Sequence, residues 1–277
     1  MRSRVPPLLL ASVLSLSACA GRASGPPALA YRLPDPTRVS YAVGDTALIE
    51  IDALGQSLAL EAKSVALYGV SFERAGDGIR ATLDIEDLEA EINVPMAGPM
   101  RVDESIVSGG LVVMLGRRGD VTIVESLEVE EAASQFFSGP TIAHAFFPGL
   151  PGTVVRAGDN WVDTVAYSEA GETGEASQSS VLTYTVIGDT SVDGRSLLEI
   201  DFAGTSESRQ TMDLQGVGIE QSMRLQVEGR MLWDLERGLM FESETTSTGT
   251  GSVRIAVAPA PLPARVQTRQ RLRLEAP

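Results

Sequence analysis

The stretch "MRLQVEGRMLW", residues 223–233, decides the fold class of this chain. Its odd-numbered positions carry Met, Leu, Val, Gly, Met and Trp, whereas Arg, Gln, Glu and Arg fill all but one of the positions between them. A period of two over this length is typical of an antiparallel β-strand with one face in a core and one in water. The stretch therefore predicts a sheet that is buried on one side.

The same alternation recurs elsewhere, at residues 79–86 and 197–202, and Gly-containing turn signals lie between such segments at 74–78, 116–120 and 235–238. We therefore predict a mainly β fold, either an antiparallel curved sheet or a half-open barrel. The residues expected on the inner face are Leu83, Ile85, Leu198, Ile200, Phe202, Leu225 and Met231. Two stretches of small polar residues, 172–180 and 245–252, are expected to be loops or ends of edge strands.

Two pairs of similar segments suggest that the sheet contains two related units. "YAVGDTALIEI" (41–51) is echoed by "VRAGDNWVDTV" (155–165), and "GLVVMLGRRGD" (110–120) by "GRMLWDLERGL" (229–239). Because both echoes occur in the same order, we predict a first β unit over 39–128 and a second over 153–277.

The N-terminal segment has the layout of an export signal. A cationic start is followed by the apolar run "LLLASVLSLSA", which is too short to span a membrane as a helix. We predict a signal peptide over residues 1–18. The following stretch is rich in small residues and Pro, so residues 19–38 are expected to form a flexible tether.

Leu16, Ser17, Ala18 and Cys19 resemble the lipobox of bacterial lipoproteins. This resemblance implies a diacylglycerol on the Cys19 sulfur and cleavage just before it, which would anchor the chain stably in a membrane. Ala20 at the next position implies the outer membrane, with the body facing the periplasm. The alternative is an ordinary secretory signal with an incidental cysteine.

The segment 129–152 differs from its surroundings and is predicted to be a helical, aromatic-rich connector, since it holds four of the seven phenylalanines. One interpretation is that it plugs the open sheet and gives both units a shared core. The other is that it forms a lid over an apolar ligand. The candidate ligand-binding residues are Phe136, Phe137, Phe146, Phe147, Leu150, Leu198, Ile200 and Phe202.

A lipobox, a tether and amphipathic strands interrupted by an aromatic helix also resemble envelope lipoproteins of the lipoprotein-carrier type. That family has an incomplete barrel that holds acyl chains beneath short helices. The segments "FPGLP" (147–151) and "GDNW" (158–161) are similar to a "FPxLP…GDxW" pattern of other bacterial lipoproteins, from which no activity follows.

Composition narrows the possible functions. The net charge of −15 argues against nucleic acid as a partner, because phosphate binding needs clustered cations. One cysteine and one histidine, His144, exclude a thiolate zinc cluster and a multi-histidine metal site, so we expect no metal or cofactor. The one basic cluster contains Arg265, Arg269, Arg271 and Arg273. It could bind a lipid phosphate or a cell-wall carboxylate, or pair with acidic neighbouring strands.

The leading hypothesis is therefore a non-enzymatic, membrane-anchored protein that binds a hydrophobic or amphiphilic ligand. A second hypothesis is an interaction module that holds another envelope protein through a sheet edge or the acidic surface. A hydrolase with His144 as its base is the third, but no G-x-S-x-G elbow is present to supply a nucleophile.

Overall fold

The computed structural model describes residues 27–53, 56–94, 98–130, 138–171, 174–214, 217–256 and 260–275. The predicted signal peptide, Cys19, Phe136 and Phe137 lie outside these ranges. Within them, none of the helices has both the length and the apolar character needed to cross a membrane.

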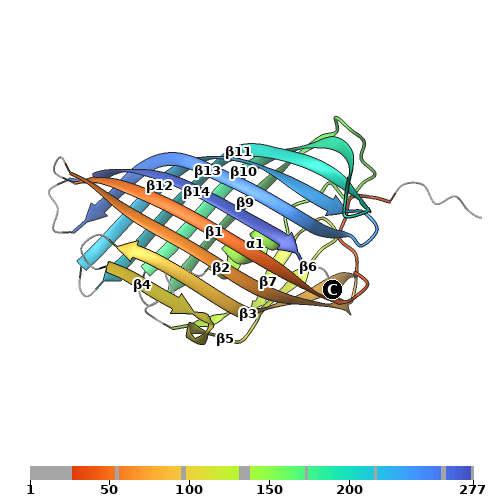
Figure 1. The fold of residues 1–277 in the computed structure, drawn as a ribbon, viewed down its shortest axis with the longest axis horizontal. Helices are drawn as coiled ribbons and strands as arrows, with labels where there is room; N and C mark the ends of the chain where they lie inside the picture. Colours follow the sequence, from red (N-terminus) through yellow and green to blue (C-terminus); the bar gives the residue numbers. More distant parts are fainter. Residues whose placement is uncertain are drawn as a thin grey trace, which may run out of the picture.

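The described chain folds mainly into one antiparallel sheet of 12 strands, which is not closed (Figure 1). Along the sheet the order is β7-β6-β3-β2-β1-β14-β13-β12-β11-β10-β9, with β4 paired to β3. The first-half strands are β1 (Arg38–Ala53), β2 (Gln56–Ala75), β3 (Gly78–Val94), β4 (Gly98–Asp103), β6 (Leu111–Leu115) and β7 (Val121–Glu125). The second-half strands are β9 (Asn160–Gly171), β10 (Gly174–Val192), β11 (Arg195–Leu214), β12 (Val217–Asp234), β13 (Leu239–Ile255) and β14 (Leu262–Leu274). This confirms the predicted fold class.

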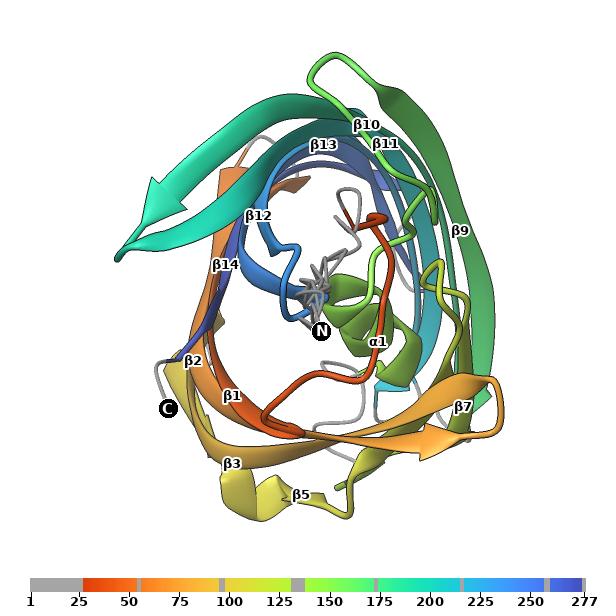
Figure 2. The same cartoon turned by 90° about the vertical axis from the view of Figure 1, so that its right-hand side faces the viewer.

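Short elements complete the fold. A 3-10 helix, η1 (Glu104–Ile106), precedes β5 (Val107–Ser108), which pairs with β8 (Glu128–Val129) in a separate two-stranded sheet. The α-helix α1 (Gly139–Phe146) lies inside the curve of the large sheet (Figure 2). The predicted helical connector therefore contains one short helix in its described part.

The two halves of the chain share one sheet because β1 pairs with β14, from Tyr41 opposite Leu274 to Ile51 opposite Ala264. The two sequence echoes have different structural counterparts. The second echo places a hairpin turn in each half, between β6 and β7 and between β12 and β13. In the first echo, Gly44 lies within β1 whereas Gly158 lies in a turn before β9. A duplication of the whole unit stays a prediction.

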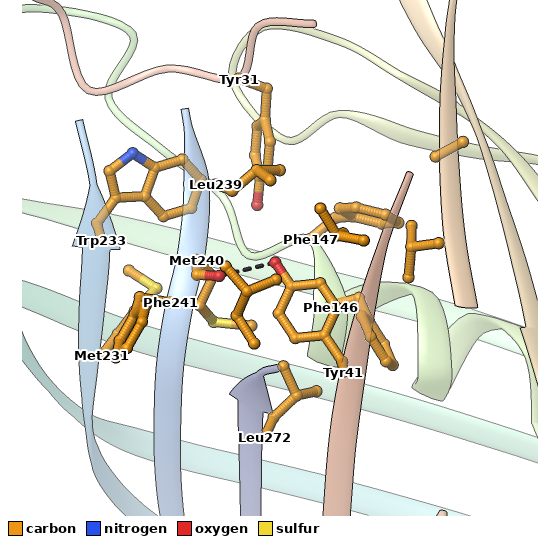
Figure 3. Close-up of a cluster of buried hydrophobic side chains, with 14 of the residues drawn as sticks. Tyr31, Tyr41, Phe146, Phe147, Met231, Trp233, Leu239, Met240, Phe241 and Leu272 are labelled. Carbon is orange, nitrogen blue, oxygen red and sulfur yellow. Dashed lines mark hydrogen bonds between the residues drawn. The ribbon is translucent and has the colours of Figure 1, made fainter. Parts of the chain in front are cut away.

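The main core occupies one end of the curled sheet, where α1 fills the concave side. Met231, Trp233 and Leu272 are buried there, together with aromatic residues of β1 and the connector (Figure 3). The Tyr41 hydroxyl donates a hydrogen bond to the Met240 carbonyl at 2.7 Å, so the phenol is satisfied inside the core. We call this end of the molecule the plugged end.

The predicted tether extends too far into the chain. Leu29 is fully buried, and its backbone N–H donates to the Thr153 carbonyl at 2.8 Å. The Tyr31 hydroxyl donates to the Pro148 carbonyl at 3.0 Å. The folded body therefore includes residues from Leu29 onward, and part of the predicted tether closes the plugged end. The small and Pro-rich composition of this stretch does not indicate that the side chains of Leu29 and Tyr31 anchor it in the core.

The prediction of a loop or strand end for residues 245–252 is wrong. These residues lie inside β13, an inner strand that pairs with β12 and β14. A Cβ at Gly249 or Gly251 would come within 2.0 Å of a backbone carbonyl oxygen of β12. Glycine here allows two strands to approach closely, which is a structural role in a bent sheet and not a turn.

Candidate functional site

The connector is positioned by the local chemistry of its ends. The Ser138 hydroxyl accepts a hydrogen bond from the Thr141 N–H, which caps α1, and Pro140 occupies the first turn. The helix ends at Phe146, two residues before Pro148, which cannot continue it. These short-range preferences place two successive aromatic rings at the end of the helix.

Both rings point into the plugged end. The Phe146 ring centroid lies 5.4 Å from that of Tyr41 and 5.0 Å from that of Tyr68, in edge-to-face geometry. Phe147 makes similar contacts with Tyr31 and Phe72 at 6.0 and 6.4 Å. The rings therefore join β1, β2 and the N-terminal segment into one aromatic cluster.

The structure brings six of the eight candidate ligand-binding residues into a single buried cluster: Phe146, Phe147, Leu150, Leu198, Ile200 and Phe202. All six are less than a tenth exposed. The cluster contains residues from both halves of the chain, which is the packing expected if the connector plugs the sheet. The two remaining candidates, Phe136 and Phe137, lie outside the described residues.

Polar contacts fasten the connector to the edge strand β9. Ser138 donates to Glu169 through its hydroxyl at 2.5 Å, and the Gly149 N–H donates to the Asp163 carboxylate at 3.0 Å. Tyr167 contacts the Thr141 hydroxyl and donates to the Gln178 amide oxygen at 2.8 Å. These contacts place two carboxylates of β9 on the inner side of the sheet without leaving them unsatisfied.

His144 belongs to the same contact zone. Its ring stacks on that of Tyr167 with centroids 6.0 Å apart and an interplanar angle of 13°. Burial lowers the pKa of His144 below its ordinary value, and the nearby Asp163 carboxylate acts in the opposite direction. This environment favours the neutral imidazole, which suits a packed residue at the helix–strand contact.

The inner face changes character beyond the plugged end. On β1, β12 and β13 it carries a group of apolar side chains that are partly exposed, and we call this group the apolar inner stripe: Ile49, Ile51, Ile219, Leu225 and Ile255. They pack on a second small core of Met223, Val253, Ala264 and Val266.

The neighbouring strands β10 and β11 present hydroxyl and amide groups on the same face. This polar inner stripe consists of Gln178, Ser180, Ser206, Ser208 and Gln210. Between the plugged end and the stripes, burial raises the pKa of the Asp45 carboxyl, and the neighbouring Gln270 and Ser64 side chains act in the opposite direction. The inner face beyond the plug is therefore amphipathic.

The outer face of most long strands is charged. Arg271 contacts Glu242 and Glu244 at 3.2 and 3.4 Å, and Arg273 contacts Glu242 at 3.7 Å. Half of the predicted basic cluster therefore pairs with the acidic neighbouring strand. These charges indicate a face that meets water.

The outer face of β9 and β10 differs because it lacks charge over a long stretch. Its side chains are small or β-branched: Val162, Thr164, Ala166, Ser168, Ser177, Ser179, Val181, Thr183 and Thr185. Val162 and Val181 are 60% and 45% exposed. This surface adjoins the edge of β9 that pairs with no strand in the large sheet.

A groove of about 1040 Å³ lies on the other half of the sheet and was not anticipated from the sequence. It is bounded by β1, β2, β3, β4 and β14. The charged side chains that line it are Glu61, Lys63, Glu89, Glu91, Arg101, Asp103 and Arg269. The basic residues of β14 were the one feature of the sequence that pointed to this groove. The other strands that bound it could be assigned only from the structure. Among the described residues, no cluster of His, Cys, Asp and Glu is placed to hold a metal ion.

No family model matches this chain, and no curated protein matches it in sequence. Two solved structures are similar to it at a low level. One is Pseudomonas aeruginosa OccK5 (OpdH), at 8% identity and a TM-score of 0.23, with 87% of this chain and 99% of that chain covered. The other is the binding domain of botulinum neurotoxin serotype C1, at 10% identity and a TM-score of 0.13, with 83% and 78% covered. Both scores are too low to carry an argument about fold or function.

Proposed function

We propose that this chain is a bacterial envelope protein, anchored to the outer membrane through a lipid on Cys19, that binds a hydrophobic or amphiphilic molecule and catalyses no reaction. The observation that carries this proposal is the amphipathic inner face beyond the plugged end. An alkyl chain lying along the apolar inner stripe would remove apolar surface from water at about 25 cal/mol per Å². A polar head group would meet the hydroxyl and amide groups of the polar inner stripe.

The anchor fits this arrangement. Ten residue steps separate Cys19 from the buried Leu29, and an extended chain of that length spans at most about 35 Å. A lipid at Cys19 would therefore keep Leu29, and with it the plugged end, within about 35 Å of the membrane surface. Met231 lies near the C-terminal end of β12 and Met223 lies eight residues before it, so the inner stripes lie further from the anchored end along the strands.

Native mass spectrometry tests the ligand directly. Residues 20–277 would be exported behind an ordinary signal, purified without detergent, and incubated with phospholipid of the bacterial envelope. We expect a defined additional mass that is lost in Ile49→Gln and Leu225→Gln, because both substitutions place an amide on the apolar inner stripe. Val181→Gln on the outer face of β10 is the matched control and should retain the ligand. A ligand-free mass under all conditions would contradict the proposal.

A second candidate function is binding of another envelope protein, favoured by the uncharged outer face of β9 and β10. A photo-crosslinking residue at Val181 should then give a discrete crosslinked product in intact cells. The same residue at Thr248, on the outer face of β13, should give none. Equal crosslinking from both positions would rule out a specific contact at β9 and β10.

A further inference from the structure

The groove on the outer face carries features that the inner-face proposal does not use. We propose that Lys63, Thr46 and Arg269 bind the phosphate of a zwitterionic phosphate–amine head group in this groove. The site lies on the opposite side of the sheet from the inner stripes and does not depend on them.

The geometry comes from the register of three neighbouring strands. Thr46 on β1 lies directly opposite Lys63 on β2 and directly opposite Arg269 on β14. Because neighbouring strands are about 4.8 Å apart, the backbones of the two cationic residues flank Thr46 at a separation of roughly 10 Å. Their long side chains can reach a common anion above Thr46, whose hydroxyl supplies a further donor. All three residues line the groove.

The residues next to these three in the sequence show which face of the sheet the site occupies. Asp45 precedes Thr46, and its partners on the two neighbouring strands are Ser64 and Gln270, so these three residues lie together on the inner face. Side chains alternate between the faces of a strand, so Thr46, Lys63 and Arg269 project to the outer face. All three are exposed.

The charge environment distinguishes this pair of cations from the two arginines that follow on β14. Lys63 is the only lysine in the sequence. Within the described residues, neither Lys63 nor Arg269 lies in a salt bridge, whereas Arg271 and Arg273 on the same strand as Arg269 are paired with Glu242. Two cations without a carboxylate partner in a strongly acidic protein are available to an external anion.

One wall of the groove is acidic and limits which anion fits. Its carboxylates are Glu61, two residues before Lys63 on β2, Glu89 and Asp103 on β3 and β4, and Glu91, which lies directly opposite Lys63 on β3 and 3.6 Å from Arg101. A free phosphate dianion would be repelled by this wall. A head group such as phosphoethanolamine would place its phosphate on Lys63 and Arg269 and its amine toward the carboxylates.

The size and apolar parts of the groove are also suited to a small amphiphile. Its volume of about 1040 Å³ is at the upper end of the usual range for ligand sites. Leu48 and Val65 line it beside the cations, and Val65 is 53% exposed. An apolar portion attached to the head group would cover these two side chains.

The single lysine makes a direct test possible. Reductive methylation of residues 20–277 with ¹³C-formaldehyde labels Lys63 and the N-terminal amine and leaves the positive charge in place. The Lys63 signal is identified by its absence in Lys63→Arg. O-phosphoethanolamine and inorganic phosphate are then titrated separately at low ionic strength, because exposed charges are screened by salt.

We expect the Lys63 signal to shift and saturate with phosphoethanolamine, with inorganic phosphate binding more weakly. Arg269→Gln should weaken phosphoethanolamine binding at least about tenfold, since it removes a charge-assisted contact. Arg265→Gln changes an exposed arginine of the same strand that does not line the groove, and it should leave binding unchanged. The unliganded signal should be identical in both variants, which verifies that the fold is intact.

Two results would overturn the proposal. If the Lys63 signal does not saturate, or if Arg265→Gln and Arg269→Gln weaken binding equally, the groove holds no specific phosphate site. If inorganic phosphate binds as tightly as phosphoethanolamine, the acidic wall does not select a zwitterion. Neither result bears on the inner stripes, so the proposed function is tested separately.

Discussion

Strand β12 passes through both ends of the molecule and shows how they differ. At the plugged end Met231 and Trp233 are almost fully buried, in contact with side chains from both halves of the chain. Eight residues earlier, Met223 belongs to a second core of only four buried residues. The alternation of the strand is the same at both places. What covers its inner face is different, because α1 and the N-terminal segment reach only the plugged end.

This comparison teaches that a regular amphipathic strand does not by itself define a core. The strand supplies an apolar face, and a packed interior forms only where another element covers that face. At the far end the inner face stays partly exposed and mixes apolar with hydroxyl and amide side chains. That end is where we place the ligand.

The largest expected difference between the ends comes from removing the same side chain at each. Met231→Ala should lower the free energy of unfolding by about 3–5 kcal/mol, because the surrounding core cannot collapse into the cavity. Met223→Ala should cost about 2 kcal/mol, because the smaller cluster can relax. Guanidinium unfolding followed by circular dichroism measures both. Equal losses would show that the two ends are packed alike.

A smaller change in the free energy of unfolding is expected where β12 and β13 approach closely at the far end. Gly251→Ala should lower the free energy of unfolding by about 1–3 kcal/mol, because its Cβ would meet the Ser222 carbonyl oxygen at 2.0 Å. The matched control is Gly44→Ala in β1, where a Cβ meets nothing within 4 Å, and its effect should be within about 0.5 kcal/mol. If Gly251→Ala is as harmless as the control, the strands are not held closely at that point.

The smallest effect is a pH dependence confined to the plugged end. Burial lowers the pKa of His144 in the folded protein below its ordinary value of about 6.5, so the unfolded chain takes up the proton first. Stability contributed by the neutral imidazole is therefore complete above about pH 6.5 and is lost as the pH falls toward the folded-state pKa. Thermal unfolding of His144→Gln should show a weaker decline over this range than the native chain. Parallel curves would show that His144 is solvated.

Much of the fold could be predicted because it depends on short-range patterns. The period of two in residues 223–233 predicted β12, its inner face and the burial of Met231, and all three are confirmed. The curved, open antiparallel sheet followed from many such strands. The alternation at Leu198, Ile200 and Phe202 likewise identified buried residues of β11.

Errors arose where composition conflicted with long-range packing. Residues 245–252 have the small polar composition of a loop, yet they form part of an inner strand because glycine is needed where two backbones meet closely. Residues 29–31 lie in a Pro-rich stretch, yet hydrogen bonds to Thr153 and Arg117 draw them into the core. The sequence gives no local sign of these partners.

The candidate sites also divide into features predicted from local sequence and features decided by long-range packing. The sequence by itself predicted a lipobox and identified the aromatic connector and the basic run on β14, since residue type and spacing suffice for each of these. Only the tertiary structure decided that the connector packs inside the sheet. It also decided that Arg271 and Arg273 are paired with carboxylates, whereas Arg269 and Lys63 flank Thr46. Strand order and register decide which residues become neighbours, and both depend on pairings between segments more than 200 residues apart, such as β1 and β14.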